Sequence, residues 1–315
     1  MAQQWQIEGP KVLDVGDEHE RVSQLKIGVV GGRVDVVTHD DSPTARIEVT
    51  EVEGLPLAVS WDGGTLTLMQ GKGSDRNVID MIKSTVENFG RTRVRVSISV
   101  PVETRTTVST VSADAVVSGL HAKVKVNTVS GNLTLSDLDG GLDLNTVSGN
   151  VECNELHGPL TVNAVSGTVT VQASDLPRVR ITTISGDVAL DLVTDTASVR
   201  SNSVSGDVTV RAPLSGFDVE GNTASGQVVV DGRQVSRTGG HGYGPHGHDK
   251  GGRIREGDGA LQLKANAISG NIVVLRAAGS DPASSGTGWR GPTGPDGPQD
   301  SPADDRRPDD RPAVG

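Results

Sequence analysis

The segment that decides the fold is Asn127-Thr-Val-Ser-Gly-Asn-Leu133, because the chain repeats it at a nearly constant interval. A fixed period of this length is typical of a solenoid, in which each repeat forms one coil and buries its apolar face against its neighbours. The serines are spaced 18, 18, 19, 20 and 20 residues apart, followed by one longer gap. The other copies are Asn145–Val151, Asn163–Val169, Thr182–Val188, Asn202–Val208, Asn222–Val228 and Asn266–Ile272.

Three columns of apolar residues emerge when each repeat is numbered from its serine. They stand three and five residues after the serine and six residues before it, and the residue just before the serine is also Val, Ile or Ala. Residues two apart share one face of a strand, so each coil is predicted to carry two short strands around a Ser-Gly corner. The columns are Leu133, Val151, Val169, Val188, Val208, Val228 and Ile272; Leu135, Cys153, Val171, Leu190, Val210, Val230 and Val274; and Val124, Leu142, Leu160, Val179, Val199, Val219 and Leu263.

The recurring polar residues are predicted to serve the stack. Stacked asparagines such as Asn127 and Asn145 can hydrogen-bond to one another along the axis. A residue repeated in every coil is typical of a structural role, and the serines have neither a Gly-x-Ser-x-Gly elbow nor a recurring histidine. Asp187 and Asp207 are the one aligned acidic pair, and we expect their carboxylates to splay into water because like charges repel.

Composition excludes several classes of partner. The net charge is −11, and no basic stripe is concentrated enough to grip nucleic acid. Aromatic residues make up 2% of the chain, which suits a narrow core of Val, Leu and Ile and argues against stacking platforms for sugars or bases. No cofactor is predicted, and no run of residues reaches the length needed for a transmembrane segment.

The start of the chain, residues 1–10, has neither the positive region nor the apolar region of a signal peptide. Cys153 is the one cysteine and falls in a core column, so we expect a buried, inert thiol. These features predict a cytoplasmic location.

Three regions depart from the regular repeat. Residues 1–105 read as an irregular β region with strands at Leu25–Val30, Arg33–Val37, Arg46–Val52, Thr65–Met69 and Val94–Val100, and with a short helix over about 75–89. The long gap hides a Gly/His-rich insertion of about 233–257 within the repeats of 106–277. Its His241, His246 and His248 are the candidate ligands of a transition metal, but without cysteine or a rigid frame we predict no metal site. Residues 278–315 are predicted to be a disordered tail.

The repeated Val-Ser-Gly-Asn and Val-Ser-Gly-Asp phrases resemble the bacterial putative-adhesin domain family of unknown function. The resemblance covers roughly Gln6 to Arg276 and includes Val100-Pro101 before the first coil. It implies a stacked β-solenoid without established catalytic residues, and the membrane segments of some relatives suggest a scaffolding role. The expected fold is therefore all-β: a single-stranded parallel β-helix or β-solenoid of about eight regular 18–20-residue coils.

The favoured function is a non-enzymatic scaffold or interaction protein, with a protein partner and possible end-to-end self-association through open strand edges. A cell-surface adhesin exported by an unrecognised route is the first alternative. A β-helix carbohydrate-active enzyme is the second, for which Asp187 and Asp207 are the one available carboxylate pair.

Overall fold

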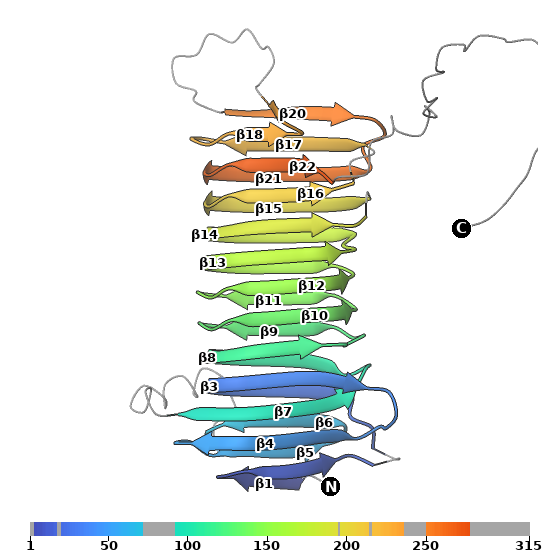
Figure 1. Ribbon diagram of the computed structural model, residues 1–315, viewed down its shortest axis with the longest axis vertical. Helices are drawn as coiled ribbons and strands as arrows, with labels where there is room; N and C mark the ends of the chain where they lie inside the picture. Colours follow the sequence, from blue (N-terminus) through green and yellow to red (C-terminus); the bar gives the residue numbers. More distant parts are fainter. Residues whose placement is uncertain are drawn as a thin grey trace, which may run out of the picture. The chain divides into compact units, whose positions relative to one another are not determined.

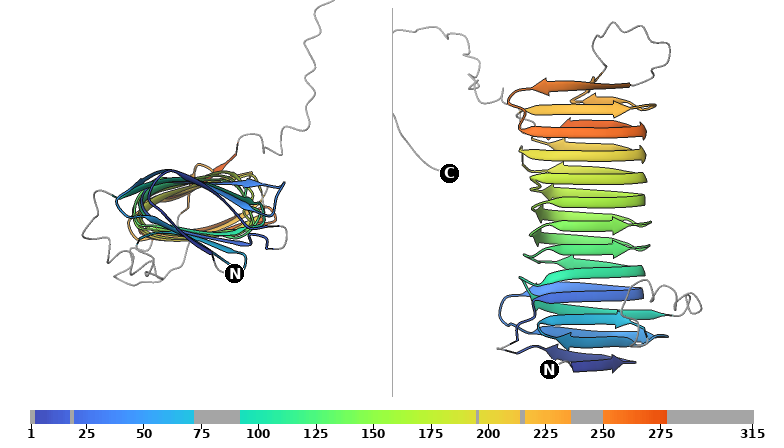
Figure 2. Two further views of the ribbon diagram at one scale, coloured as in Figure 1. Left: turned by 90° about the horizontal axis from the view of Figure 1, so that it is seen from below. Right: turned by 180° about the vertical axis from the view of Figure 1, so that it is seen from behind.

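The protein is a coil of β-strands. A computed structural model describes residues 3–17, 20–71, 92–194, 196–213, 216–235 and 250–277. Every regular element in these ranges is a strand, and the 22 strands join one continuous sheet that stacks along a single axis (Figure 1). Viewed along that axis, the strands trace a flattened oval with two long walls (Figure 2). The fold is therefore an all-β solenoid, as predicted.

The central strands stack in sequence order and in parallel register. Asn145 pairs with Asn127 on one side and with Asn163 on the other, so the register repeats the period read from the sequence. We call the strands before each Ser-Gly corner the first wall and those after it the second wall. The central strands are β8 (Arg105–Ser118), β9 (Val124–Thr128), β10 (Leu133–Asp139), β11 (Leu142–Thr146), β12 (Val151–His157), β13 (Leu160–Ser174), β14 (Arg178–Leu192), β15 (Ala197–Ser205) and β16 (Val208–Ala212).

The core lies between the two walls. All three apolar columns predicted to line it are buried, which confirms the column assignment. Each fully buried Val or Leu contributes about 1.5–3 kcal/mol by leaving water, so the repeated columns are the main stabilising feature of the stack. Cys153 is 1% exposed, and burial raises the pKa of its thiol to about 12, as expected for an inert core residue.

Glycine is required at the corner because consecutive coils approach closely there. Gly167 has φ +105°, and a Cβ at this position would lie 2.1 Å from the carbonyl oxygen of Gly149. Only glycine combines this backbone conformation with this contact.

At the N-terminal end, the order of strands in space differs from their order in the sequence. β3 lies between β8 and the pair β6 and β7, while β5, β4, β1 and β2 continue outward in antiparallel pairs. The two predicted strands at Leu25–Val30 and Arg33–Val37 form one continuous strand, and the outermost strands were not predicted. The bounds are β1 (Gln3–Ile7), β2 (Lys11–Val15), β3 (Gln24–His39), β4 (Ala45–Glu53), β5 (Leu57–Asp62), β6 (Thr65–Gln70) and β7 (Arg93–Pro101). The predicted helix over 75–89 lies outside the described residues.

At the C-terminal end, the last repeat is intercalated. β21 and β22 pair with β15 and β16 on one side and with β17 and β18 on the other, so the final coil lies beneath the coil that precedes it in sequence (Figure 1). β20 then covers the outer edge of β17 in antiparallel fashion, and β19 pairs with β18. The bounds are β17 (Phe217–Thr223), β18 (Val228–Val230), β19 (Arg233–Gln234), β20 (Lys250–Glu256), β21 (Leu261–Ser269) and β22 (Ile272–Arg276). The predicted tail, 278–315, lies outside the described residues.

Candidate functional site

The outer face of the first wall carries three parallel columns, because alternate residues of a strand point to opposite faces. The residues five, three and one positions before each serine all point outward. The first of these columns is mostly charged, the second is mostly asparagine and the third is apolar. The same three chemical characters therefore run side by side along the stack.

The apolar column is a surface feature. Its side chains are well exposed, with Val147 at 47%, Ile184 at 51% and Ile268 at 58%. Single exposed apolar residues are ordinary in a folded protein, but here they recur at the same position of successive repeats. We call this line the corner stripe: Val129, Val147, Val165, Ile184, Val204 and Ile268.

A shallow groove runs beside the corner stripe. It has a volume of about 480 Å³ and is lined by Val129, Val147, Val165 and Ile184, with the asparagine column along its other side. Its volume falls within the range of about 300–1,000 Å³ that is usual for sites that hold small ligands. We call it the corner groove.

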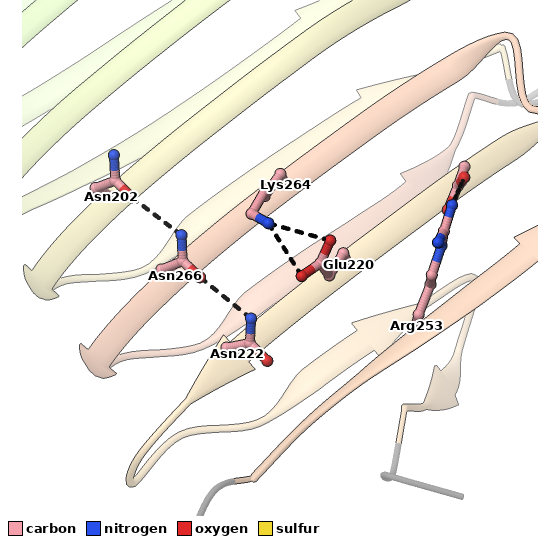
Figure 3. Close-up of polar contacts among 7 residues, drawn as sticks. Asn202, Glu220, Asn222, Arg253, Lys264 and Asn266 are labelled. Carbon is pink, nitrogen blue, oxygen red and sulfur yellow. Dashed lines mark hydrogen bonds and ion pairs between the residues drawn. The ribbon is translucent and has the colours of Figure 1, made fainter.

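The asparagine column forms the predicted ladder. The Nδ2 of Asn145 donates to the Oδ1 of Asn127 at 3.0 Å, and the Nδ2 of Asn163 donates to the Oδ1 of Asn145 at 2.9 Å. A second segment follows the intercalated order: the amide of Asn266 lies between those of Asn202 and Asn222 (Figure 3). Hydrogen bonds join successive coils in both segments, which confirms the structural interpretation of this column.

The serines also join coils. The hydroxyl of Ser148 donates to the carbonyl of Val129 at 3.2 Å, and the hydroxyl of Ser166 donates to the carbonyl of Val147 at 3.1 Å. Ser148 and Ser166 thus each bond to the stripe residue of the coil before them. A hydroxyl bonded in this way has a structural role, because it links two neighbouring coils.

The aligned aspartates bind backbone, so the expectation that they splay into water was wrong. The Oδ1 of Asp187 accepts from the backbone N–H of Asp207 at 2.9 Å. The Oδ1 of Asp207 accepts from the backbone N–H of Asn271 at 2.7 Å. Because each carboxylate bonds to the coil above it, the two acids do not converge on a shared site.

Ion pairs cross from coil to coil on both walls. Arg211 donates through Nε to the Oδ1 of Asp191 at 2.7 Å, and this hydrogen bond holds the pKa of the carboxyl below its ordinary value. These two residues lie one repeat apart and in register on adjacent strands. On the first wall, the Nζ of Lys264 lies 3.1 Å from the Oε1 of Glu220 (Figure 3).

No group of three or more His, Cys, Asp or Glu side chains in the described part of the chain is arranged to hold a metal ion. His241, His246 and His248 lie outside the described residues. Within the described ranges there is also no helix long and apolar enough to cross a bilayer.

A protein-family model, Toastrack DUF4097, matches residues 24–275 of the chain. The chain belongs to this family. The match confirms the resemblance drawn from the repeats, and it covers the Toastrack solenoid from β3 to β22. A search of curated proteins gave no match.

Solved structures similar to this Toastrack chain include three bacterial proteins. One is a putative adhesin from Bacteroides fragilis, with 11% identity, a TM-score of 0.37 and coverage of 85% of this chain and 98% of that one. Another is a putative lipid binding protein from Parabacteroides distasonis, with 11% identity, a TM-score of 0.35 and coverage of 85% and 97%. A putative cell adhesion protein from Clostridium sporogenes has 14% identity, a TM-score of 0.24 and coverage of 85% and 100%.

Proposed function

We propose that this chain is a non-enzymatic interaction scaffold, about eight regular solenoid coils long, that binds its partner through the outer face of the first wall. The corner stripe is the observation that supports this proposal. The coils are held together by the buried columns, the asparagine ladder and the serine bonds. The exposed Val and Ile side chains contribute little to that stack, so a partner surface is the physical explanation for their alignment.

The absence of catalysis is part of the proposal. A glycosidase needs two carboxylates facing one bond at a set separation. Asp187 and Asp207 instead bond to the backbone of the next coil. The hydroxyls of Ser148 and Ser166 are likewise bonded to backbone carbonyls, and none of these groups is arranged as an acid, base or nucleophile.

The test compares the corner groove with an exposed apolar residue elsewhere. The double variant Val147→Thr with Val165→Thr keeps the β-branched shape and adds hydroxyls to the groove. We expect it to lose at least half of the fluorescence of a bound hydrophobic dye such as anilinonaphthalene sulfonate, with little change in urea midpoint. The control is Val37→Thr, since Val37 is 41% exposed and lies on β3 outside the groove. Equal dye binding by all three proteins, or a large loss of stability in the double variant, would show that the stripe is not a binding surface.

We further propose a cytoplasmic location. The support is chemical: Cys153 is a free, buried thiol, so the fold needs no oxidising compartment. Protease treatment of intact host cells, with fractionation, tests this. A shielded protein supports a cytoplasmic scaffold, whereas cleavage at the surface would make the adhesin interpretation the leading one.

End-to-end self-association stays a prediction. One end of the stack carries the outer strands β1 and β2, and the other carries β19 and β20. A monomer in sedimentation velocity at high concentration would argue against it.

A further inference from the structure

Three neighbouring coils of the first wall present a patch that is cationic along one side and apolar along the other. We call it the amphipathic patch; it contains the outward residues of the coils whose serines are Ser185, Ser205 and Ser269. Each coil contributes one cation, one polar residue and one apolar residue, in that order along the strand. The nine residues are Arg180, Thr182 and Ile184; Arg200, Asn202 and Val204; and Lys264, Asn266 and Ile268.

The cations are held in a row by strand register. Arg180 pairs with Arg200, and Arg200 pairs with Lys264, on adjacent parallel strands. Neighbouring strands lie about 4.8 Å apart, and like charges directly opposite one another are destabilising. Lys264 is neutralised by Glu220. Among the described residues no acidic side chain pairs with Arg180 or Arg200, so both charges are available to an external anion.

The apolar side of the patch is equally exposed. Ile184, Val204 and Ile268 are 51%, 45% and 58% exposed. They stand four residues along the strand from the cations, which corresponds to roughly 13 Å on the same face of the sheet. A flat surface with cations at one side and protruding aliphatic side chains at the other suits a lipid interface, where phosphates and acyl chains lie at neighbouring depths.

The intercalation of the last repeat creates this patch. If the coils stacked in sequence order, the coil of Ser225 would follow that of Ser205. Glu220 would then lie beside Arg200, and Ala224 would lie beside Val204. The observed order inserts Lys264 and Ile268 at those positions instead. Both replacements make the face more cationic and more apolar, although the protein as a whole carries a net charge of −11.

We propose that the amphipathic patch docks the scaffold on a bilayer rich in anionic phospholipid. This rests on the proposed function, since it names the partner of the same outer face. Arg180 and Arg200 bind lipid phosphates, while Ile184, Val204 and Ile268 insert at the boundary between headgroups and acyl chains. The charge of the patch, opposite to that of the chain as a whole, selects an anionic surface.

The experiment is flotation of the purified full chain with vesicles. Phosphatidylcholine vesicles are compared with vesicles that also contain about 30% phosphatidylglycerol, an anionic content in the physiological range. We expect binding to the anionic vesicles and its loss in high salt. Each removed cation lowers membrane partitioning roughly fivefold, so Arg180→Gln with Arg200→Gln should bind about 25-fold more weakly. Ile184→Thr with Ile268→Thr should also weaken binding.

The matched control is Arg46→Gln with Arg95→Gln. It makes the same change in net charge on exposed arginines of the N-terminal strands, and we expect less than a twofold effect. Equal binding to both vesicles, or an unchanged Arg180/Arg200 variant, would overturn the proposal. Binding of dextran sulfate with the same arginine dependence, but no vesicle binding, would make the patch a site for a soluble polyanion instead. Loss of dye binding in the Val147/Val165 variant without vesicle binding by the wild type would retain the proposed function and reject the lipid partner.

Discussion

Filling the gap in the asparagine ladder should stabilise the protein. Thr182 occupies the asparagine column between Asn163 and Asn202, in register with both. The substitution Thr182→Asn places an amide where it can donate to the Oδ1 of Asn163 and accept from the Nδ2 of Asn202. This would join the two ladder segments into one.

The expected gain follows from two surface hydrogen bonds. Each contributes about 0.5–1.5 kcal/mol net, and the lower half of that range applies to exposed amides, which gives about 1–2 kcal/mol in total. Replacing Thr by Asn in a strand costs about 0.5 kcal/mol, since the whole propensity scale spans about 1 kcal/mol. The net gain is therefore about 0.5–1.5 kcal/mol, or about 1–3 °C in Tm for a chain of this size.

The assay is urea unfolding followed by circular dichroism. The control is Thr209→Asn, which makes the same change on an outward position of the second wall, where the neighbours in register are Ala189 and Val273. It carries the propensity cost without an amide partner, so we expect a loss of about 0.5 kcal/mol. If the two variants shift stability equally, the ladder does not contribute as argued.

Three further predictions follow from the corner, the core and one ion pair. Gly167→Ala should destabilise the fold by about 3 kcal/mol or more in urea unfolding, because the new Cβ meets the Gly149 carbonyl at a positive φ. Cys153 should resist a thiol reagent in the native state and react on unfolding, because burial raises its pKa to about 12, whereas Glu152→Cys in a Cys153→Ala background should react at once. The Asp191–Arg211 pair should add a small, salt-screened stabilisation above the unfolded pKa of the carboxyl, and this contribution should disappear as the pH falls through its lowered folded pKa. Asp191→Asn should therefore differ from wild type in urea midpoint at neutral pH and match it in strong acid.

Much of the central fold follows from the sequence because the repeat is nearly exact there. The buried columns, the Asn145 ladder and the pairing of Asp191 with Arg211 depend on register alone, and register is fixed by the period. The exposure of the corner stripe was also available from the sequence. Val147 stands five residues after the buried Leu142, and an odd offset along a strand places two residues on opposite faces.

The order of the outer coils could not be predicted from the repeat. Asn222 and Asn266 belong to equivalent copies, so the ladder can accept either one next to Asn202. Which of the two lies next to Asn202 depends on the path of the chain after β17. β20 pairs with one edge of β17, and β21 then pairs with its other edge. The left-handed residues within β10 and β12 were missed for a different reason: Asp137 and Glu155 adopt positive φ, which nothing in their residue type requires.

The intercalated ends restrict how such a protein can change in length. A repeat duplicated at either terminus would have to enter between coils that already pair with each other, and it would separate β15 from β21 or β8 from β3. From β8 to β16, by contrast, neighbours in sequence are neighbours in space, so one repeat can be gained or lost there with its pairing intact. Whole repeats can therefore be inserted or deleted only in the middle of this solenoid, while the strand order at its two ends must be kept.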